Sequence, residues 1–260
     1  MSSELIYSLS LDSSIFYGGC MSGIFTVLGS GSSGNCSYLE VGETRLLIDA
    51  GLSGLQIRKR LASIGRSTES LTGILITHEH SDHSQGLSSL CRYLNAPVYC
   101  NRLTREALET RLKNQPQFRI FTTGSRFDLE DVSVDNFSIP HDANDPVGFM
   151  LETECGRFGF LTDLGHTNRM VVDRIRKADV LLLESNYDLR LLQEDTRRPW
   201  SLKQRIISRH GHLSNDDAAD LVEQIAGEGL KNLYLGHLSR DCNRPELAEK
   251  AVYNRLKKLG

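Results

Sequence analysis

Three histidines and Asp82 gather within one six-residue segment, His78 to His83, directly after the apolar run Gly73–Thr77. So many imidazole and carboxylate groups cannot all be buried without partners. Neutral imidazoles and carboxylates are good ligands for zinc, manganese or iron. Alternate residues at a strand end point the same way, so His78 and His80 can share one metal ion, and Asp82 and His83 can face a second. A solvated turn is the alternative interpretation, but histidines rarely cluster after a buried strand by accident.

A second segment that could do chemistry is basic. Between Arg197 and His212 the chain has five Lys or Arg residues and no Asp or Glu, and its only tryptophan, Trp200, lies among them. Such a stretch can follow a phosphate backbone and stack a base, which makes Trp200, Lys203 and Arg205 candidate substrate contacts. Because the whole chain has a net charge of −3, phosphate has to be attracted by a local patch of this kind. The alternative is a solvated helix face with a core tryptophan.

A glycine-rich loop could also bind an anion. Ser32, Ser33 and Asn35 follow the β-prone run Ile24–Leu28 and can offer hydroxyl and turn N–H groups to a phosphate. Alternatively, they only form a tight turn near the histidine segment.

A histidine beside a helix start is the next candidate. His212 lies just before Ser214, where a serine followed by acidic residues predicts the capped, positive end of a helix. Such an end favours phosphate, so His212, Ser214 and Asn215 are candidate substrate-site residues. The alternative for His212 is a histidine in a surface turn without a function.

Length and composition limit the class of protein. The chain has 260 residues, 39% hydrophobic and 24% charged, which excludes disorder or a coiled coil as the whole answer. No apolar stretch approaches the roughly 20 residues that cross a bilayer. Six scattered cysteines, with no Lys or Arg in residues 1–22, indicate reduced thiols in a cytoplasmic protein without a signal peptide. We expect one domain over 23–260 and an N-terminal extension over 1–22, of which residues 1–20 would be absent if native translation starts at Met21.

The elements that position these residues are strands followed by helices, twice over. Apolar and alternating runs predict strands over 24–28, 36–41, 45–48, 73–77, 97–100, 118–121, 125–129, 132–139, 147–153, 157–162, 180–184 and 230–236. Helical periodicity and caps predict helices over 55–64, 83–93, 103–112, 169–176 and 201–208, from 214 onward, and over 245–258. This order predicts an α/β fold in which two sheets pack face to face with helices outside.

The segment His78 to His83 after its strand resembles the metal-binding motif of the metallo-β-lactamase superfamily. The resemblance implies an αββα sandwich of two mixed β-sheets with a mono- or dinuclear metal centre at one edge. It also implies two ligand sets. One ion would be held by His78, His80 and His141, and the other by Asp82, His83 and His237, with Asp163 bridging the two. Asp49 matches the acid that orients the histidine loop, and we expect Glu184 to organise the same edge by hydrogen bonding.

Further motifs narrow the resemblance to the YycJ/WalJ branch of bacterial metallo-β-lactamase-fold proteins. These motifs are the runs 29–36, 184–188, 200–206, 211–215 and 236–239. The resemblance implies a phosphodiester hydrolase, specifically a 5′→3′ exonuclease on single-stranded DNA that uses two Zn²⁺ or Mn²⁺ ions. A metal-bridging hydroxide would attack phosphorus, with Asp82 and His212 acting in catalysis and His212 as proton donor to the leaving group.

Two other functions stay open, because this fold hosts several chemistries. The same site could hydrolyse a small cyclic phosphodiester or a thioester. A closed pocket would favour that function, whereas a wide basic channel from the metals to Trp200 would favour nucleic acid. The protein could also be a non-catalytic accessory of a two-component signalling system, although the complete ligand set argues against a vestigial site.

Overall fold

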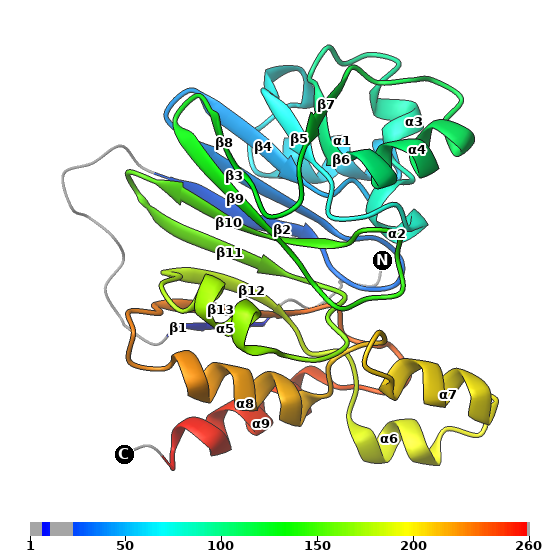
Figure 1. Ribbon diagram of the computed structural model, residues 1–260, viewed down its shortest axis with the longest axis vertical. Helices are drawn as coiled ribbons and strands as arrows, with labels where there is room; N and C mark the ends of the chain where they lie inside the picture. The colour runs from blue at the N-terminus through cyan, green and yellow to red at the C-terminus, as the bar shows by residue number, and fades with distance from the viewer. Residues whose placement is uncertain (1–6, 11–22, 259–260) are drawn as a thin grey trace.

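Two β-sheets packed face to face form the centre of the computed structural model, which describes residues 7–10 and 23–258 (Figure 1). One sheet has seven strands, in the order β1 (Tyr7–Ser10), β13 (Asn232–Gly236), β12 (Val180–Glu184), β11 (Gly156–Leu161), β10 (Val147–Thr153), β9 (Val132–Ser138) and β8 (Arg126–Leu129). The other has six, in the order β2 (Ile24–Gly29), β3 (Cys36–Val41), β4 (Thr44–Ile48), β5 (Gly73–Leu75), β6 (Val98–Asn101) and β7 (Phe118–Phe121).

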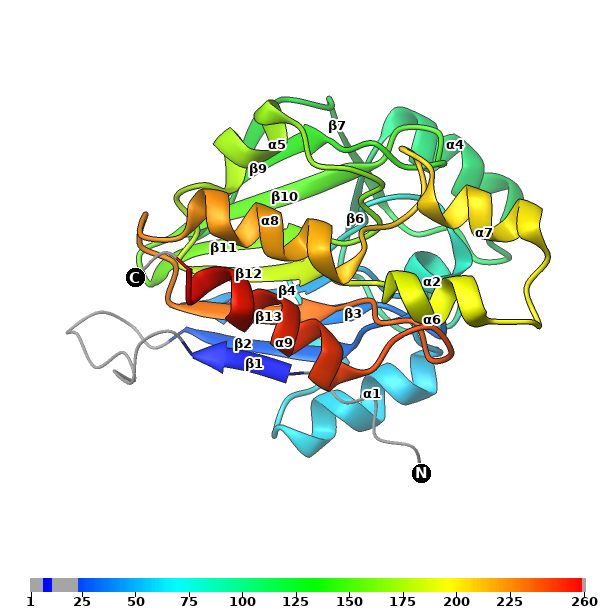
Figure 2. The ribbon, with the colours of Figure 1, turned by 90° about the horizontal axis from the view of Figure 1, so that it is seen from below.

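Helices cover the outer face of each sheet (Figures 1 and 2). The six-stranded sheet packs against α1 (Gly54–Ser63), α3 (Leu87–Leu90) and α4 (Arg102–Arg111). The seven-stranded sheet packs against α5 (Arg169–Ile175), α8 (Asn215–Ile225) and α9 (Pro245–Leu256). A third apolar layer fills the space between the sheets, with Leu39, Leu75 and Phe149 among its fully buried side chains. The predicted αββα sandwich of two mixed sheets is therefore confirmed.

Strand direction brings the polar segments to one edge of the sandwich. β4 runs parallel to β5, and β11, β12 and β13 run parallel to one another in the other sheet. The carboxyl ends of parallel strands meet at the same sheet edge, and the loops that follow them converge there. Asp49 follows β4, the histidine segment follows β5, and Asp163 and His237 follow β11 and β13.

The helix predicted over 83–93 is wrong in its extent. The structure has two short helices instead, α2 (Ser81–Ser84) and α3, which meet at Gly86. The backbone groups at the break bond to neighbouring loops: the Asp82 carbonyl accepts from Asn35 N at 2.7 Å, and Gly86 N donates to the Ala50 carbonyl at 2.8 Å. A Cβ on Gly86 would lie 2.3 Å from the Leu52 carbonyl oxygen, so only glycine fits there.

One helix was not predicted from the sequence. It is α6 (Leu189–Glu194), which is only six residues long and is capped by the Asp188 side chain. α6 lies beside α7 (Trp200–Ile207) at the end of the molecule that also holds α2 (Figures 1 and 2). Most of the predicted extension, 1–22, falls outside the described residues. Its strand β1 pairs antiparallel with β13, and the proposed start at Met21 stays a prediction.

Two sequence expectations about the class of protein can be compared with the fold. Within residues 7–10 and 23–258, no helix is both long and apolar enough to span a bilayer. Cys36, Cys100 and Cys242 are buried thiols outside any disulfide, as expected of scattered cysteines.

Candidate metal centre

Three side chains of the site sit on strained backbone immediately after strands. Asp49, Asp163 and His237 have φ values of 61°, 58° and 54°, a left-handed conformation that residues other than glycine seldom adopt. Such strain costs of order 1–3 kcal/mol per residue and persists only where the surroundings enforce it, typically at functional sites. All three side chains are buried at the sheet edge, where they approach the histidine segment.

The first group of metal donors is His78, His80 and His141, whose ligand atoms lie within 4.8 Å of one another. His80 Nδ1 and His141 Nε2 are 3.3 Å apart. His141 Nδ1–H donates to the Gly211 carbonyl at 3.2 Å, which leaves Nε2 free to bind a cation. The buried Nε2 atom of His78 has no hydrogen-bond partner.

The second group is Asp82, His83, Asp163 and His237, again within 4.8 Å. His83 Nε2 lies 2.7 Å from Asp163 Oδ2, and His237 Nε2 lies 3.6 Å from Asp82 Oδ2. The other Asp163 oxygen, Oδ1, is 3.7 Å from His141 Nε2 in the first group. Asp163 therefore faces both groups, as expected of a bridging carboxylate.

Two buried carboxylates hold the rings of the second group. Asp49 Oδ2 accepts from His83 Nδ1 at 2.7 Å and is itself held by the Thr77 hydroxyl at 2.9 Å. Glu184 Oε1 accepts from His237 Nδ1 at 2.6 Å. Each contact fixes the ring so that Nε2 points into the centre, which is how outer partners orient metal-binding histidines.

The unsatisfied atoms of the centre fit divalent cations. His78 Nε2 and His237 Nε2 are buried and lack hydrogen-bond partners, and Asp163 Oδ2 makes no directed hydrogen bond although His83 Nε2 lies 2.7 Å from it. Buried polar atoms are rarely left so, because each costs about 1–3 kcal/mol. Nitrogen and carboxylate oxygen donors in this number suit zinc or manganese. The donor set thus supports metal binding.

The protonation states of His78 and Asp163 agree with this use. Burial, reinforced by His83, holds the pKa of His78 well below its usual value, so its ring is neutral, as a metal ligand must be. Burial raises the pKa of Asp163, but His237 and His83 outweigh it and hold the pKa well below its usual range. Asp163 is therefore ionised in the folded protein. Burial lowers the pKa of His83 and of His237, but Asp163 outweighs it and leaves both pKa values raised, so a cation binding there would displace their protons.

His212 stands at the rim of the centre. Its Nδ1 is 2.8 Å from Glu184 Oε1 and 3.6 Å from Asp163 Oδ1. Burial lowers the pKa of His212, but the Glu184 carboxylate more than offsets this and leaves the pKa raised. Donor atoms of Asp163, Glu184, His212 and His237 also cluster closely enough for a cation. Because Glu184 accepts from both rings, we assign it to orienting them, as the sequence predicted.

A cleft of about 360 Å³ opens above the two groups. Its walls include Ser32, His212 and Arg205, so these three predicted residues face the centre. Arg205 reaches in from α7 and pairs with Asp142 at 2.5 Å. Sequence reasoning missed Asp142, although it directly follows the ligand candidate His141.

Further wall residues that the sequence reasoning did not assign are Arg198, Asn186 and Ser239. Arg198 lies in the basic stretch 197–212, and that stretch is the sequence signal that could have identified it. Ser33 is exposed outside the cleft and accepts a hydrogen bond from Arg240 at 2.9 Å. Trp200 is 63% exposed and does not line the cleft, so it is neither a core residue nor in contact with the centre.

Four predicted substrate contacts are held elsewhere by structural hydrogen bonds. The buried ammonium group of Lys203 donates to the Gln193 carbonyl at 2.7 Å. Ser214 caps α8 by accepting from Asp217 N at 3.0 Å, and the buried Asn215 bonds to Asn243 at 2.8 Å. Asn35 accepts from Gly31 N at 2.9 Å and lies 2.9 Å from His83 Nε2. These hydrogen bonds give the four residues structural roles, and their contact with substrate stays a prediction.

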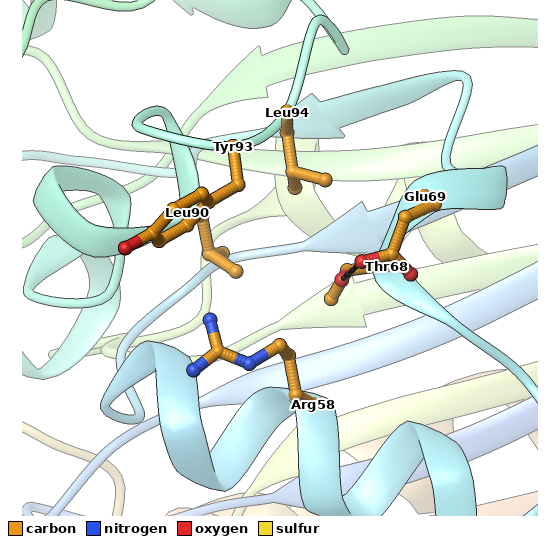
Figure 3. A pocket seen from close by; sticks show the side chains of 6 residues that line it. All are labelled: Arg58, Thr68, Glu69, Leu90, Tyr93 and Leu94. Carbon is orange, nitrogen blue, oxygen red and sulfur yellow. Dashed lines mark hydrogen bonds between the residues drawn. The ribbon is translucent and has the colours of Figure 1, made fainter.

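A separate hollow of about 290 Å³ lies beside α1 and α3 (Figure 3). Arg58 stands over the Tyr93 ring at 6.0 Å there, and Leu90 and Leu94 form part of the wall. None of its six lining residues belongs to the metal centre. The chemistry-bearing side chains are in the other cleft.

Comparisons with known proteins agree with the geometry. The β-lactamase superfamily domain matches residues 44–237. The chain is 39% identical over 236 residues to the exodeoxyribonuclease WalJ of Streptococcus pneumoniae serotype 2, covering 89% of this chain and 87% of that one. It is 38% identical over 238 residues to the exodeoxyribonuclease YycJ of Bacillus anthracis, covering 91% and 90%.

A solved structure supports the fold independently. The metallo-β-lactamase fold protein YhfI of Bacillus subtilis superposes with a TM-score of 0.70 at 16% identity, over 90% of this chain and 93% of that one. With the sandwich and the two donor groups at its edge, these similarities show that the chain belongs to the metallo-β-lactamase superfamily, in the branch that includes WalJ and YycJ.

Proposed function

We propose that this protein is a metal-dependent exodeoxyribonuclease that degrades single-stranded DNA from its 5′ end. The observation that carries the proposal is the position of Asp163 between two donor groups at the floor of an arginine-lined cleft. Two relatives that match about nine-tenths of this chain are named exodeoxyribonucleases. Single-strand preference and polarity rest on the resemblance to that branch.

We propose that two divalent cations, Zn²⁺ or Mn²⁺, bind in the centre. One would be held by His78, His80 and His141, and the other by Asp82, His83 and His237, with Asp163 shared. When bound, such a pair would lower the pKa of water, so that hydroxide is available at neutral pH to attack a phosphodiester, and it would neutralise charge on the phosphate. Asp49 and Glu184 keep the donor nitrogens aimed at the cations.

The chain's own residues supply the remaining steps. Arg205 at the cleft wall can exchange Asp142 for a phosphate oxygen of the substrate, since guanidinium groups bind both anions with the same fork. His212 is poised to donate a proton to the departing oxygen. Its raised pKa favours the protonated ring, and Glu184 fixes the ring.

The shape of the cleft favours a polymer over a small ester. The cleft is not closed: His80, Asp82 and Arg205 line it and also line a neighbouring hollow of about 440 Å³ beside α4. Trp200 lines neither the cleft nor the hollow, so the open side of the cleft faces α4 and does not run toward Trp200. The free thiols Cys36, Cys100 and Cys242 support a cytoplasmic location.

A nuclease assay tests the proposal. Purified protein with Mn²⁺ or Zn²⁺ is incubated with DNA and RNA, single- and double-stranded, labelled at either end. We expect mononucleotides to be released from single-stranded DNA starting at the 5′ end, and His80→Ala to abolish this. Release from the 3′ end, or hydrolysis of small esters alone, would contradict the proposal.

A further inference from the structure

The hollow beside α4 adjoins the active-site cleft, and Arg205 of α7 lies on the border between the two spaces. Its walls are the histidine segment on one side and Ala107, Thr110 and Arg111 of α4 on the other. Because His80, Asp82 and Arg205 border both spaces, a chain lying across the metal centre can continue from one into the other.

Charge on α4 is balanced everywhere except at this hollow. Arg102 pairs with Glu106 at 2.6 Å and Arg105 pairs with Glu109 at 2.8 Å. Arg111, at the last position of the helix, is exposed, and no carboxylate of the described residues lies within ion-pair distance of it. Its guanidinium donates only to neutral oxygens, the Glu79 carbonyl and the Ser84 hydroxyl, the latter at 2.9 Å.

Glu79, whose carbonyl oxygen accepts from Arg111, turns its carboxylate to another partner. Glu79 Oε1 accepts from Asn144 N at 2.9 Å, so that side chain is held by the loop after β9. Arg111 has further N–H donors, and it lies beside the Ser84 hydroxyl and a hollow that is continuous with the metal centre. Its charge and the planar arrangement of its donors match a phosphate group.

We propose that Arg111 forms a second phosphate-binding site that holds the nucleic acid strand beyond the scissile bond, with Thr110 in its wall. The strand then runs from the metal centre past Arg205, which borders both spaces, to Arg111 on α4. This inference rests on the proposed nuclease function and adds the strand's path.

The test compares a long single-stranded oligonucleotide with bis(p-nitrophenyl) phosphate, a phosphodiester that has no further phosphate beyond the scissile bond. We expect Arg111→Gln to raise KM for the oligonucleotide up to about tenfold, as one charge-assisted hydrogen bond is lost. The slope of the logarithm of the binding constant against the logarithm of salt concentration should become less negative by about one. Hydrolysis of the small ester should stay unchanged, and Arg111→Lys should keep most of the affinity. Arg102→Gln, on the same helix but outside the hollow, is the matched control with no effect on either substrate.

Two results would overturn the inference. An equal loss on both substrates means that Arg111 only holds the histidine loop through Glu79 and Ser84. No loss on the oligonucleotide means that the strand takes another path. Anisotropy of a labelled oligonucleotide is measured in parallel. If the wild type hydrolyses no DNA, the proposed function fails, while weaker binding by Arg111→Gln than by Arg102→Gln still supports the strand path and equal binding refutes it.

Discussion

The floor of the active site and its walls are built in opposite ways. On the floor, five of the seven predicted donors are buried, His80 and Asp82 are half-buried, and many are held by a further contact, as His83 is by Asp49 and His237 is by Glu184. On the walls, the exposed side chains of Arg205 and Arg111 make few contacts. The floor is therefore fixed before substrate arrives, whereas the walls can exchange partners when a charged chain binds.

The difference shows that burial determines how much a polar contact contributes in this fold. Buried polar atoms must be satisfied, so few arrangements of the floor are possible. Exposed arginines are screened by water and contribute about 0–1 kcal/mol through an ion pair such as Arg102–Glu106. Replacing floor residues should consequently change the reaction by orders of magnitude, and replacing wall residues should change substrate binding by about tenfold or less.

The largest effect is expected at the shared carboxylate. Asp163→Ala should abolish nuclease activity and lower metal content, because Asp163 faces both donor groups. Activity is followed on single-stranded DNA and metal content by elemental analysis, with circular dichroism as the control for folding. Nuclease activity that survives in a folded variant would break the distinction between floor and walls.

His212 belongs to the rim and should affect chemistry without affecting metal binding. His212→Gln is expected to lower kcat about 10²–10⁴-fold, the range for loss of a general acid. The raised pKa of His212 means that its proton is present below that pKa and lost above it, so wild-type kcat should fall as pH rises through it. The variant should lose this alkaline limb. A variant that keeps the limb would assign the proton to another group.

Asp49 tests whether the floor depends on its outer partners. Asp49→Asn removes the carboxylate that accepts from His83 Nδ1 and from Thr77. Metal affinity should fall about 10–100-fold, as is usual for such partners, and added Mn²⁺ or Zn²⁺ should restore activity. Titration of the ion against activity measures the shift, and unchanged affinity would show that His83 is oriented by other contacts.

The smallest effects are expected at two positively charged side chains of α7, and they differ in kind. Arg205→Gln should weaken DNA binding about tenfold, since Arg205 lines the cleft. Lys203→Gln should leave binding unchanged and instead lower stability by roughly 1–3 kcal/mol, because the Gln193 carbonyl loses its partner. Anisotropy and denaturant unfolding measure the two properties, and the opposite pattern would refute the assignment.

Sequence patterns were informative where local chemistry decides the structure. The sandwich and the grouping of seven candidate ligands follow from apolar runs, each ending in a polar residue, and from a resemblance carried by the histidine segment. The positive φ values at Asp49, Asp163 and His237 had no sequence signal, because they are imposed by contacts between distant loops.

The walls were harder to predict because helix orientation is a tertiary property. Lys203 and Arg205 are two positions apart in α7 and therefore face different sides of it, yet both belonged to one basic run. Arg111 lies far from that run in sequence and has no motif of its own. Its place beside the histidine segment follows from the packing of α4.

Anomalous diffraction at the absorption edge of the bound metal tests the central claim most directly. Crystals are grown from protein purified without chelators. The account predicts two neighbouring peaks, one among His78, His80 and His141 and one among Asp82, His83 and His237, with the Asp163 carboxylate between them. A single peak, or a peak held by Glu184 and His212 instead, would contradict it.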